Sequence, residues 1–285
     1  MNKIYDTLEA LNLTSKKTRK VLSENTRDKP GVIVWQDQES KVIYIEDTHC
    51  EMDDYLTGGY RQGDQKSSYE SDKDLKRRVT NYRQFYMGLN ICDVGCGAGD
   101  FLLNVKSSTQ MASAVELQTK YVELLNSNGV QCVNNIQSHK TFFDTIFAFH
   151  SLEHFDDPLR MLQDMKSKLK SGGRVVIEVP HANDFLMAKL EFRPFIDFTL
   201  WSPHLVLHTR ESLSRILIAA GFKNVLVEGV QRYPVSNHLH WLLNAFPGGH
   251  KRNLSVIDSD ELSKAYENAL RKIDATDTLV AIAEI

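Results

Sequence analysis

The sequence predicts an α/β protein built on a mainly parallel sheet of seven strands, with helices on both faces. Short apolar segments alternate with segments of helical periodicity from about residue 72 onward. One predicted strand runs directly into a glycine-rich turn that opens a helix. The chain has 285 residues, of which 42% are hydrophobic and 25% charged, and this is enough for a sizeable buried core.

Residues 1–71 are predicted to form an N-terminal extension. Residues 1–28 are polar with weak helical spacing, and the apolar segments 32–35 and 42–45 flank a polar stretch, which predicts a β-hairpin. The stretch 53–71 is rich in glycine and tyrosine. We interpret it as a loop whose tyrosines Tyr55, Tyr60 and Tyr69 either pack or form a lid over a cofactor.

Residues 72–285 are predicted to form the main, Rossmann-like domain. It begins with a helix of about four turns that Gly88 ends, and a later helix begins at the cap Asp157 and ends at Gly172-Gly173. Thr209 is expected to cap another helix. Strands are predicted at 90–94, 112–115, 130–133, 143–149, 174–179, 225–230 and 279–282. A helical insertion is predicted at 231–276, before the last strand, and its Trp241-Leu242-Leu243 run suggests a homodimer.

Composition narrows the class of partner. The formal net charge of −3 gives no overall basic field, so a nucleic-acid partner is not expected. The N-terminus lacks the apolar core of a signal peptide, and no apolar run approaches the roughly 18 residues of a membrane span. The four cysteines form no Cys-x-x-Cys pair. We therefore expect a cytoplasmic protein with reduced thiols, no metal site and no membrane partner.

The most informative motif is Asp93-Val94-Gly95-Cys96-Gly97-Ala98-Gly99, between a predicted strand and a helix. Its glycines permit a tight turn and a close ligand approach, and the helix start offers free N–H groups. Dinucleotide sites use Gly-x-Gly-x-x-Gly, whereas the spacing here is Gly-x-Gly-x-Gly with an acid two residues before it. Asp93 is placed to meet the cationic amine of an amino-acid ligand, which a dinucleotide lacks.

A second acid complements this loop. Glu116 ends the next predicted strand, 17 residues past Gly99, where it can accept hydrogen bonds from both hydroxyls of a ribose. The two acids together predict a ligand with an amino-acid half and a nucleoside half. The alternatives are a turn that binds nothing and a nicotinamide cofactor.

At these residues the chain resembles the class I S-adenosylmethionine-dependent methyltransferases, and the resemblance covers about 75–285. The segments 143–158, 169–180 and 208–222 are similar to the family's later strand segments. The resemblance implies S-adenosyl-L-methionine as cofactor. Asn134-Asn135-Ile136 departs from the aspartate that many members use near adenine, so a backbone group or Ile136 is expected there. The predicted cofactor-binding residues are Asp93, Gly95, Cys96, Gly97, Gly99, Phe101, Glu116, Leu117, Ile136, Phe149 and His150.

Histidines after two strands are candidates for a catalytic base, because imidazole accepts protons near neutral pH. His150 directly follows a strand and is expected at the cofactor's methionine end, whereas His154 would face the acceptor with Glu153 orienting it. The alternative is that Glu153 and His154 only fix the loop. His181 follows the fifth strand at the same edge, and His204 and His208 are expected to cap and pack.

The substrate is predicted only by analogy. The N-terminal hairpin is similar to the front end of bacterial methyltransferases that act on sugars in surface-polysaccharide pathways. The leading hypothesis is O-methylation of a small polar acceptor, such as a sugar or sugar nucleotide. The alternatives are a methyltransferase directed at carbon, nitrogen or a macromolecule, and a non-catalytic cofactor-binding domain.

Overall fold

The chain divides into two compact units. The computed structural model describes residues 3–47 and 69–285. Unit 1 comprises Met1–His49, Val179–Ile216 and Val227–Val280, and unit 2 comprises Cys50–Glu178, Leu217–Leu226 and Ala281–Ile285. Most of the loop predicted at 53–71, including Tyr55 and Tyr60, lies outside the described residues. The domain boundary between residues 71 and 72 stays a prediction.

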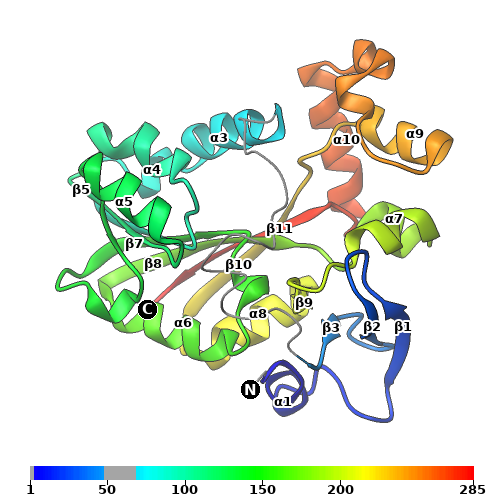
Figure 1. Cartoon of the computed structure of the whole chain (residues 1–285), viewed down its shortest axis with the longest axis horizontal. Helices are drawn as coiled ribbons and strands as arrows, with labels where there is room; N and C mark the ends of the chain where they lie inside the picture. The colour runs from blue at the N-terminus through cyan, green and yellow to red at the C-terminus, as the bar shows by residue number, and fades with distance from the viewer. Residues whose placement is uncertain (1–2, 48–68) are drawn as a thin grey trace. The chain divides into compact units, whose positions relative to one another are not determined.

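A seven-stranded sheet, to which every strand contributes residues of unit 2, confirms the predicted fold class. Its order is β10-β11-β8-β7-β4-β5-β6 (Figure 1). The central pairs β4–β5, β5–β6, β4–β7 and β7–β8 are parallel. The strands are β4 (Asn90–Val94), β5 (Met111–Val115), β6 (Gln131–Val133), β7 (Phe143–Phe149), β8 (Leu169–Pro180), β10 (Lys223–Val230) and β11 (Thr278–Glu284).

Helices cover both faces of this sheet. Figure 1 shows α3 and α4 on one face and α6 on the other. Because β7 is covered on both sides, Ile146, Phe147 and Ala148 are completely buried, as the apolar run predicted. The helices of this part are α3 (Tyr69–Asn81), η1 (Arg83–Phe85), α4 (Asp100–Val105), η2 (Lys106–Ser108), α5 (Thr119–Ser127), η3 (Ile136–Ser138), η4 (Leu152–His154) and α6 (Pro158–Ser167).

The start of α6 is as predicted, but its end is not. Asp157 caps it, because its Oδ1 accepts a hydrogen bond from the Arg160 N–H at 3.0 Å. The helix ends at Ser167 and β8 already begins at Leu169, so the prediction of a helix reaching the glycine pair was wrong. Gly172 has φ 74° and lies where the β7–β8 register shifts, between Leu169 and Arg174. The glycines therefore form a bulge in a strand rather than a helix terminus.

Unit 1 contains a four-stranded sheet of order β1-β2-β3-β9, antiparallel throughout. The predicted hairpin is confirmed as β2 (Pro30–Asp37) and β3 (Ile43–Ile45). The polar edge strand β1 (Arg19–Asn25) was missed, because its register shifts twice against β2 and hides any alternation. Helix α1 (Ile4–Ala10) accounts for the weak helical spacing, and β9 (Val206–Leu207) pairs with β3.

The predicted insertion is helical, as expected. It contains α9 (Val235–Asn244), η6 (Gly249–Lys251), η7 (Asn253–Ile257) and α10 (Asp260–Lys272), and Figure 1 shows α9 beside α10. Upstream lie the π-helical turn η5 (Phe185–Lys189), α7 (Arg193–Thr199) and α8 (Arg210–Ala219), of which only α8 was predicted. In the part of the chain that the structure describes, no helix is both long enough and apolar enough to cross a bilayer.

Candidate functional site

The glycine loop lies where the sequence placed it, between β4 and α4 in unit 2. Gly95, Gly97 and Gly99 have φ angles of 75°, 57° and 75°, a region that L-residues rarely adopt. A Cβ on Gly95 would lie 2.6 Å from Ser151 Cβ, and one on Gly99 would lie 2.3 Å from Leu125 Cδ2. A Cβ on Gly97 would meet nothing within 4 Å. The outer glycines are therefore required by packing, whereas Gly97 borders open space.

Asp93, the residue before the last of β4, is a buried carboxylate with an unsatisfied oxygen. Among the described residues, no hydrogen-bond donor reaches its Oδ1. The pKa of Asp93 is raised to about 7: burial is the main cause, the nearby Arg78 guanidinium opposes it, and the charges of Glu116 and Glu178 add to it. A buried carboxylate without a partner is costly, so this atom favours a cationic hydrogen-bond donor.

Glu116 follows β5 and is tied to backbone N–H groups. Its Oε2 accepts from Gly97 N at 2.8 Å, and its Oε1 accepts from Leu117 N at 2.8 Å and Gln118 N at 2.9 Å. A carboxylate offers about four acceptor positions, so capacity for a hydroxyl donor remains. The bond to Gly97 also links the second acid directly to the loop.

The other predicted cofactor residues fall into two groups. Cys96 and Leu117 are half-buried beside the loop and Glu116, and Ile136 is buried at the start of η3. Phe101 and Phe149 belong to an aromatic cluster in which their ring centroids lie 5.1 Å apart. Phe101 is buried within it, whereas Phe149 keeps partial exposure.

Three predicted polar residues lie beyond the end of β7. His150 has a left-handed φ of 51°, and its Nδ1 lies 3.5 Å from Glu153 Oε1. Glu153 is completely buried in η4, and a carboxylate oxygen of it lies within 4.8 Å of a ring nitrogen of His154. Glu153 therefore lies near both imidazoles, and its orienting role stays a prediction.

A buried ion-pair network that the sequence analysis missed lies at the end of β8. Glu178 is completely buried and accepts hydrogen bonds from Arg77 at 2.7 and 2.9 Å and from Arg78 at 2.7 and 2.9 Å. The Tyr82 hydroxyl donates to it at 2.7 Å. The two guanidinium groups hold the pKa of Glu178 well below its usual value against the cost of burial. The sequence held one sign of this network, because Glu178 is an acid within the otherwise apolar run 175–179 and a buried acid needs partners.

This network borders the predicted cofactor residues. The Arg78 guanidinium lies 4.3 Å from the centroid of the Phe149 ring, and the Tyr82 and Phe149 rings stack with centroids 5.8 Å apart. His150 Nε2 is 4.0 Å from Glu178 Oε2, and the Glu178 carbonyl accepts from His150 N at 2.8 Å. Arg77 and Arg78 thus fix the backbone and rings at this end of the sheet.

The remaining candidate base, His181, belongs to unit 1. It is buried, its Nδ1 donates to the Thr276 carbonyl at 2.9 Å, and burial lowers its pKa to about 4. The ring is therefore neutral at pH 7. His208, expected to cap, is 2.9 Å from Ser212 Oγ through Nδ1, and Thr209 Oγ1 accepts from Ser212 N at 3.2 Å.

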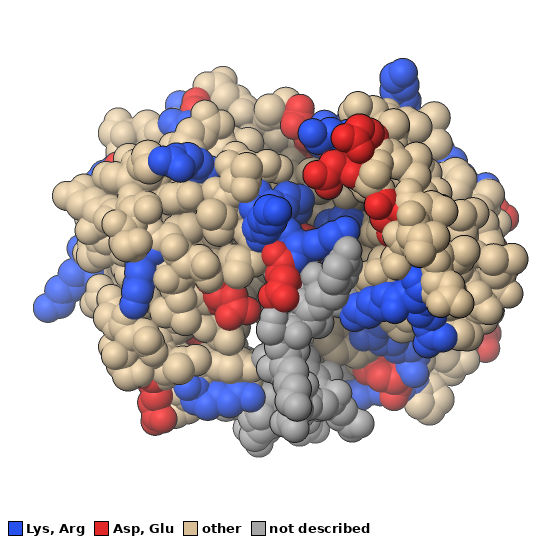
Figure 2. All heavy atoms as spheres, turned by 90° about the horizontal axis from the view of Figure 1, so that it is seen from above, with Lys and Arg blue, Asp and Glu red and all other residues tan. Residues whose placement is uncertain are grey.

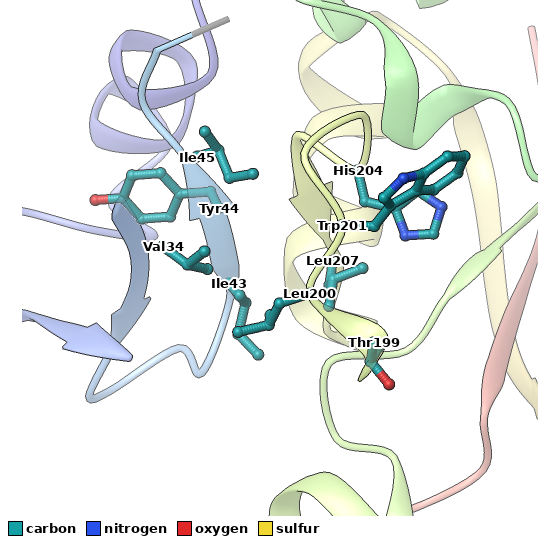
Figure 3. A pocket seen from close by; sticks show the side chains of 9 residues that line it. All are labelled: Val34, Ile43, Tyr44, Ile45, Thr199, Leu200, Trp201, His204 and Leu207. Carbon is teal, nitrogen blue, oxygen red and sulfur yellow. The ribbon is translucent and has the colours of Figure 1, made fainter. Parts of the chain in front are cut away.

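Unit 1 also contains a small apolar pocket, shown in Figure 3, lined by none of the predicted catalytic or cofactor residues. Isoleucines 43 and 45 face it from β3, opposite Leu200 and the Trp201–His204 pair, whose rings meet edge to face at 5.0 Å. The full lining is Val34, Ile43, Tyr44, Ile45, Thr199, Leu200, Trp201, His204 and Leu207. We assign it to packing of the small sheet.

Three observations show that the residues present fit S-adenosylmethionine. The unsatisfied Asp93 Oδ1 suits an ammonium group, and Gly97 leaves room for a ligand where a side chain would intrude. Glu116 keeps an acceptor position for a ribose hydroxyl.

Comparisons with known proteins agree with this geometry. A family model described as a methyltransferase domain matches residues 58–227. The tRNA U34 carboxymethyltransferase of Campylobacter hominis is 32% identical over 102 residues, which are 32% of this chain and 36% of that protein. The ubiquinone biosynthesis O-methyltransferase of Xanthomonas euvesicatoria pv. vesicatoria is 28% identical over 101 residues, 32% of this chain and 42% of that protein. The matches thus span only 36% and 42% of the length of these two curated relatives.

One solved structure shows the same fold. The magnesium protoporphyrin IX methyltransferase from Synechocystis PCC 6803, crystallised with bound S-adenosylhomocysteine, superposes with a TM-score of 0.50 at 12% identity. The match covers 81% of this chain and 96% of that one.

Proposed function

This chain belongs to the methyltransferase domain family and carries an S-adenosylmethionine-dependent methyltransferase domain; from that premise we propose that it methylates an oxygen atom of a small polar acceptor. A sugar or sugar nucleotide is our first candidate. The observation that carries the proposal is the unsatisfied Asp93 carboxylate beside the open face of Gly97. The acceptor is motivated only by the resemblance to sugar methyltransferases that we expect for the N-terminal hairpin, the segment that forms β2 and β3.

The cofactor, when bound, supplies a methyl group that is already strongly electrophilic. Asp93 would bind the amino group, Glu116 a ribose hydroxyl, and the loop N–H groups the polar atoms near them. The protein's remaining contribution is to hold the acceptor in line, which is worth on the order of 7–11 kcal/mol. A hydroxyl acceptor also requires a base for its proton.

We assign the base to His154, with Glu153 orienting it. What supports this assignment is the position of the buried Glu153 carboxylate, of which an oxygen lies within 4.8 Å of a ring nitrogen of His154. His150 is then the group that faces the methionine end, from its left-handed position after β7. His181 is the weaker candidate, because burial lowers its pKa to about 4.

A second candidate substrate is tRNA, favoured by the name of the Campylobacter hominis relative. Our expectation that nucleic acid is not a partner therefore loses support. On the face shown in Figure 2, however, basic and acidic side chains are interspersed rather than gathered into a continuous positive field. The name of the ubiquinone biosynthesis O-methyltransferase also favours an oxygen acceptor, and we add small phenols to the panel that should be tested.

Calorimetry with S-adenosylhomocysteine tests the cofactor assignment. We expect Asp93→Ala and Glu116→Ala each to lower affinity at least about 100-fold, since each removes a charged hydrogen bond at a buried site. The control Glu123→Ala, an exposed acid on α5, should bind normally. Unchanged affinity in both site variants, with the fold intact by circular dichroism, would refute the assignment.

Methyl transfer from labelled cofactor then tests the acceptor. Sugar nucleotides, small phenols and unmodified tRNA form the three arms. The proposal expects turnover with a small hydroxyl acceptor and a loss of about 10²–10⁴-fold in kcat for His154→Ala. Turnover with tRNA and with no other acceptor would refute the proposed small acceptor, but the protein would still be a methyltransferase.

A further inference from the structure

Two of the four cysteines, Cys96 and Cys132, lie close together in unit 2. Cys96 belongs to the glycine loop, between Gly95 and Gly97, and is half-buried. Cys132 is the middle residue of β6 and is 5% exposed. Both are free thiols in this structure, and no step of the proposed methyl transfer uses either of them. The pair is therefore a nucleophilic group that the proposed reaction leaves unused.

Glu116 explains why the two cysteines meet. Gly97 N donates to Glu116 Oε2 at 2.8 Å, and Glu116 N donates to the Val133 carbonyl at 2.9 Å. Cys96 Sγ lies 3.7 Å from the carbonyl oxygen of Gly97, and Cys132 Sγ lies 4.0 Å from that of Val133. Each sulfur is thus beside a residue that is hydrogen-bonded to Glu116. The loop after β4 and the strand β6 therefore meet at the end of β5, the strand between them.

The two thiols are hydrogen-bonded to each other. The Cys96 thiol donates to the Cys132 sulfur, and this bond raises the pKa of Cys96, to which burial adds. The same bond lowers the pKa of Cys132, which burial opposes and a hydrogen bond from the Glu116 N–H supports. Because the thiolate is the nucleophilic form of cysteine, Cys132 is the more reactive member of the pair.

Cys92 on β4 shows what a cysteine outside the pair looks like. It is completely buried, and burial together with the charge of Asp93 raises its pKa well above the usual value. Cys92 therefore stays a protonated, inaccessible thiol, and it serves below as the matched control.

We propose that Cys96 and Cys132 form an oxidation site, at which a peroxide produces a disulfide that weakens cofactor binding until a thiol reductant reverses it. The cofactor part of this inference rests on the function proposed above. A disulfide needs a sulfur–sulfur distance of about 2.05 Å, so the hydrogen-bonded sulfurs must approach each other. Gly97, next to Cys96, borders open space and lets the loop follow.

The reaction balances with peroxide as the oxidant. The Cys132 thiolate attacks one peroxide oxygen, the O–O bond breaks, and the leaving hydroxide takes up a proton to become water. The Cys96 thiol then releases its proton and attacks the sulfenic sulfur of Cys132. The S–S bond forms, the S–O bond breaks and a second water leaves. The two thiols lose two electrons, and the peroxide gains them.

The disulfide would act on the cofactor through Gly97 and Glu116. Drawing Cys96 toward β6 also moves Gly97, whose N–H holds the Glu116 oxygen in place. We expect affinity for S-adenosylhomocysteine to fall about 10-fold or more, which corresponds to about one charge-assisted hydrogen bond. Linkage requires the reverse effect as well, so saturating S-adenosylhomocysteine should lower the equilibrium constant for disulfide formation by the same factor.

Intact mass of the full chain after hydrogen peroxide, with free thiols alkylated, tests the oxidation site. The native chain should lose two hydrogen atoms and two alkylatable thiols, and dithiothreitol should restore both. A tryptic digest should join peptide 84–106 to peptide 121–140. Because the first peptide also contains Cys92, Cys92→Ala is the control and should form the same cross-link. A chain that keeps all its thiols, or that forms sulfinic acid instead, would overturn the proposal.

Calorimetry with S-adenosylhomocysteine tests the effect on the cofactor. Cys132→Ala should bind it like the native chain when reduced and should keep that affinity after peroxide, whereas the native chain and Cys92→Ala should lose it. Cys132→Ser, closer in shape to cysteine, is the second variant and should behave like Cys132→Ala. A native disulfide that leaves affinity unchanged would overturn the proposed coupling.

The two measurements separate this inference from the proposed function. The cross-link is detected without cofactor, so its absence would refute the oxidation site alone. A reduced native chain that does not bind S-adenosylhomocysteine would instead refute the cofactor assignment. Equilibration in a glutathione redox buffer measures the linkage, and equal oxidised fractions with and without S-adenosylhomocysteine would contradict it.

Discussion

Two buried carboxylates at the same edge of one sheet have opposite environments. Glu178, at the end of β8, receives hydrogen bonds from two arginines and a tyrosine. Asp93, two strands away at the end of β4, keeps an oxygen without a donor among the described residues. Burial acts on both, but it raises the pKa of Asp93 to about 7 while the arginines keep that of Glu178 low. The difference separates an acid that stabilises the fold from one kept for a ligand.

Removal of Glu178 is expected to have the largest effect on stability. Glu178→Ala would leave two partly buried guanidinium groups without their carboxylate, and breaking such a pair costs about 3–5 kcal/mol. Denaturation in urea measures the loss. Asp164→Ala, which breaks the exposed Arg160–Asp164 pair, is the control and should cost at most about 0.5 kcal/mol. If Glu178→Ala and Asp164→Ala lost the same free energy of unfolding, Glu178 would not be the fold-stabilising acid that the comparison requires.

The acid at β4 should show the reverse behaviour. Because the pKa of Asp93 is raised in the folded state, the native protein holds a proton that the unfolded chain releases, and stability falls as pH rises from about 4 to about 7. Asp93→Asn removes this loss. Without cofactor, the variant should be more stable than the native chain above pH 7, by up to a few kcal/mol, and the gap should close near pH 4.

Urea unfolding at several pH values measures that gap. Cofactor affinity of the native chain should rise through pH 7 over the same range, because the ionised carboxylate binds an ammonium group. If the difference in unfolding free energy between Asp93→Asn and the native chain did not change with pH, Asp93 would be a structural acid like Glu178.

The smallest effect is expected at Gly97. Gly97→Ala places a side chain at φ 57° with no neighbour within 4 Å, so it should cost only about 1–2 kcal/mol in stability. Gly129→Ala has a φ of 75° and equally open space, and should cost the same. Only the Gly97 variant should lose cofactor affinity in calorimetry, by about 10-fold or more. Equal affinities would mean that the open space is not used by a ligand.

The features that could be predicted from the sequence are those that depend on residues close together in the chain. The strand, loop and helix around Asp93 lie within a dozen residues, and all seven strands of the large sheet were predicted because apolar runs and turn residues mark them locally. The Arg77–Glu178 contact joins residues 101 positions apart, so only the fold reveals it. The sequence also did not show which side of α9 is buried, because Trp241 and Leu243 are both apolar but only Trp241 is buried.

The irregular edge strand β1 limits how copies of this chain can associate. Two interruptions, between Val21 and Ser23 and between Ser23 and Asn25, break its ladder with β2. An incoming strand would therefore find no even row of amide donors and carbonyl acceptors along the outer side of β1. Growth of the small sheet into a fibre is disfavoured, and contacts between molecules are left to side chains.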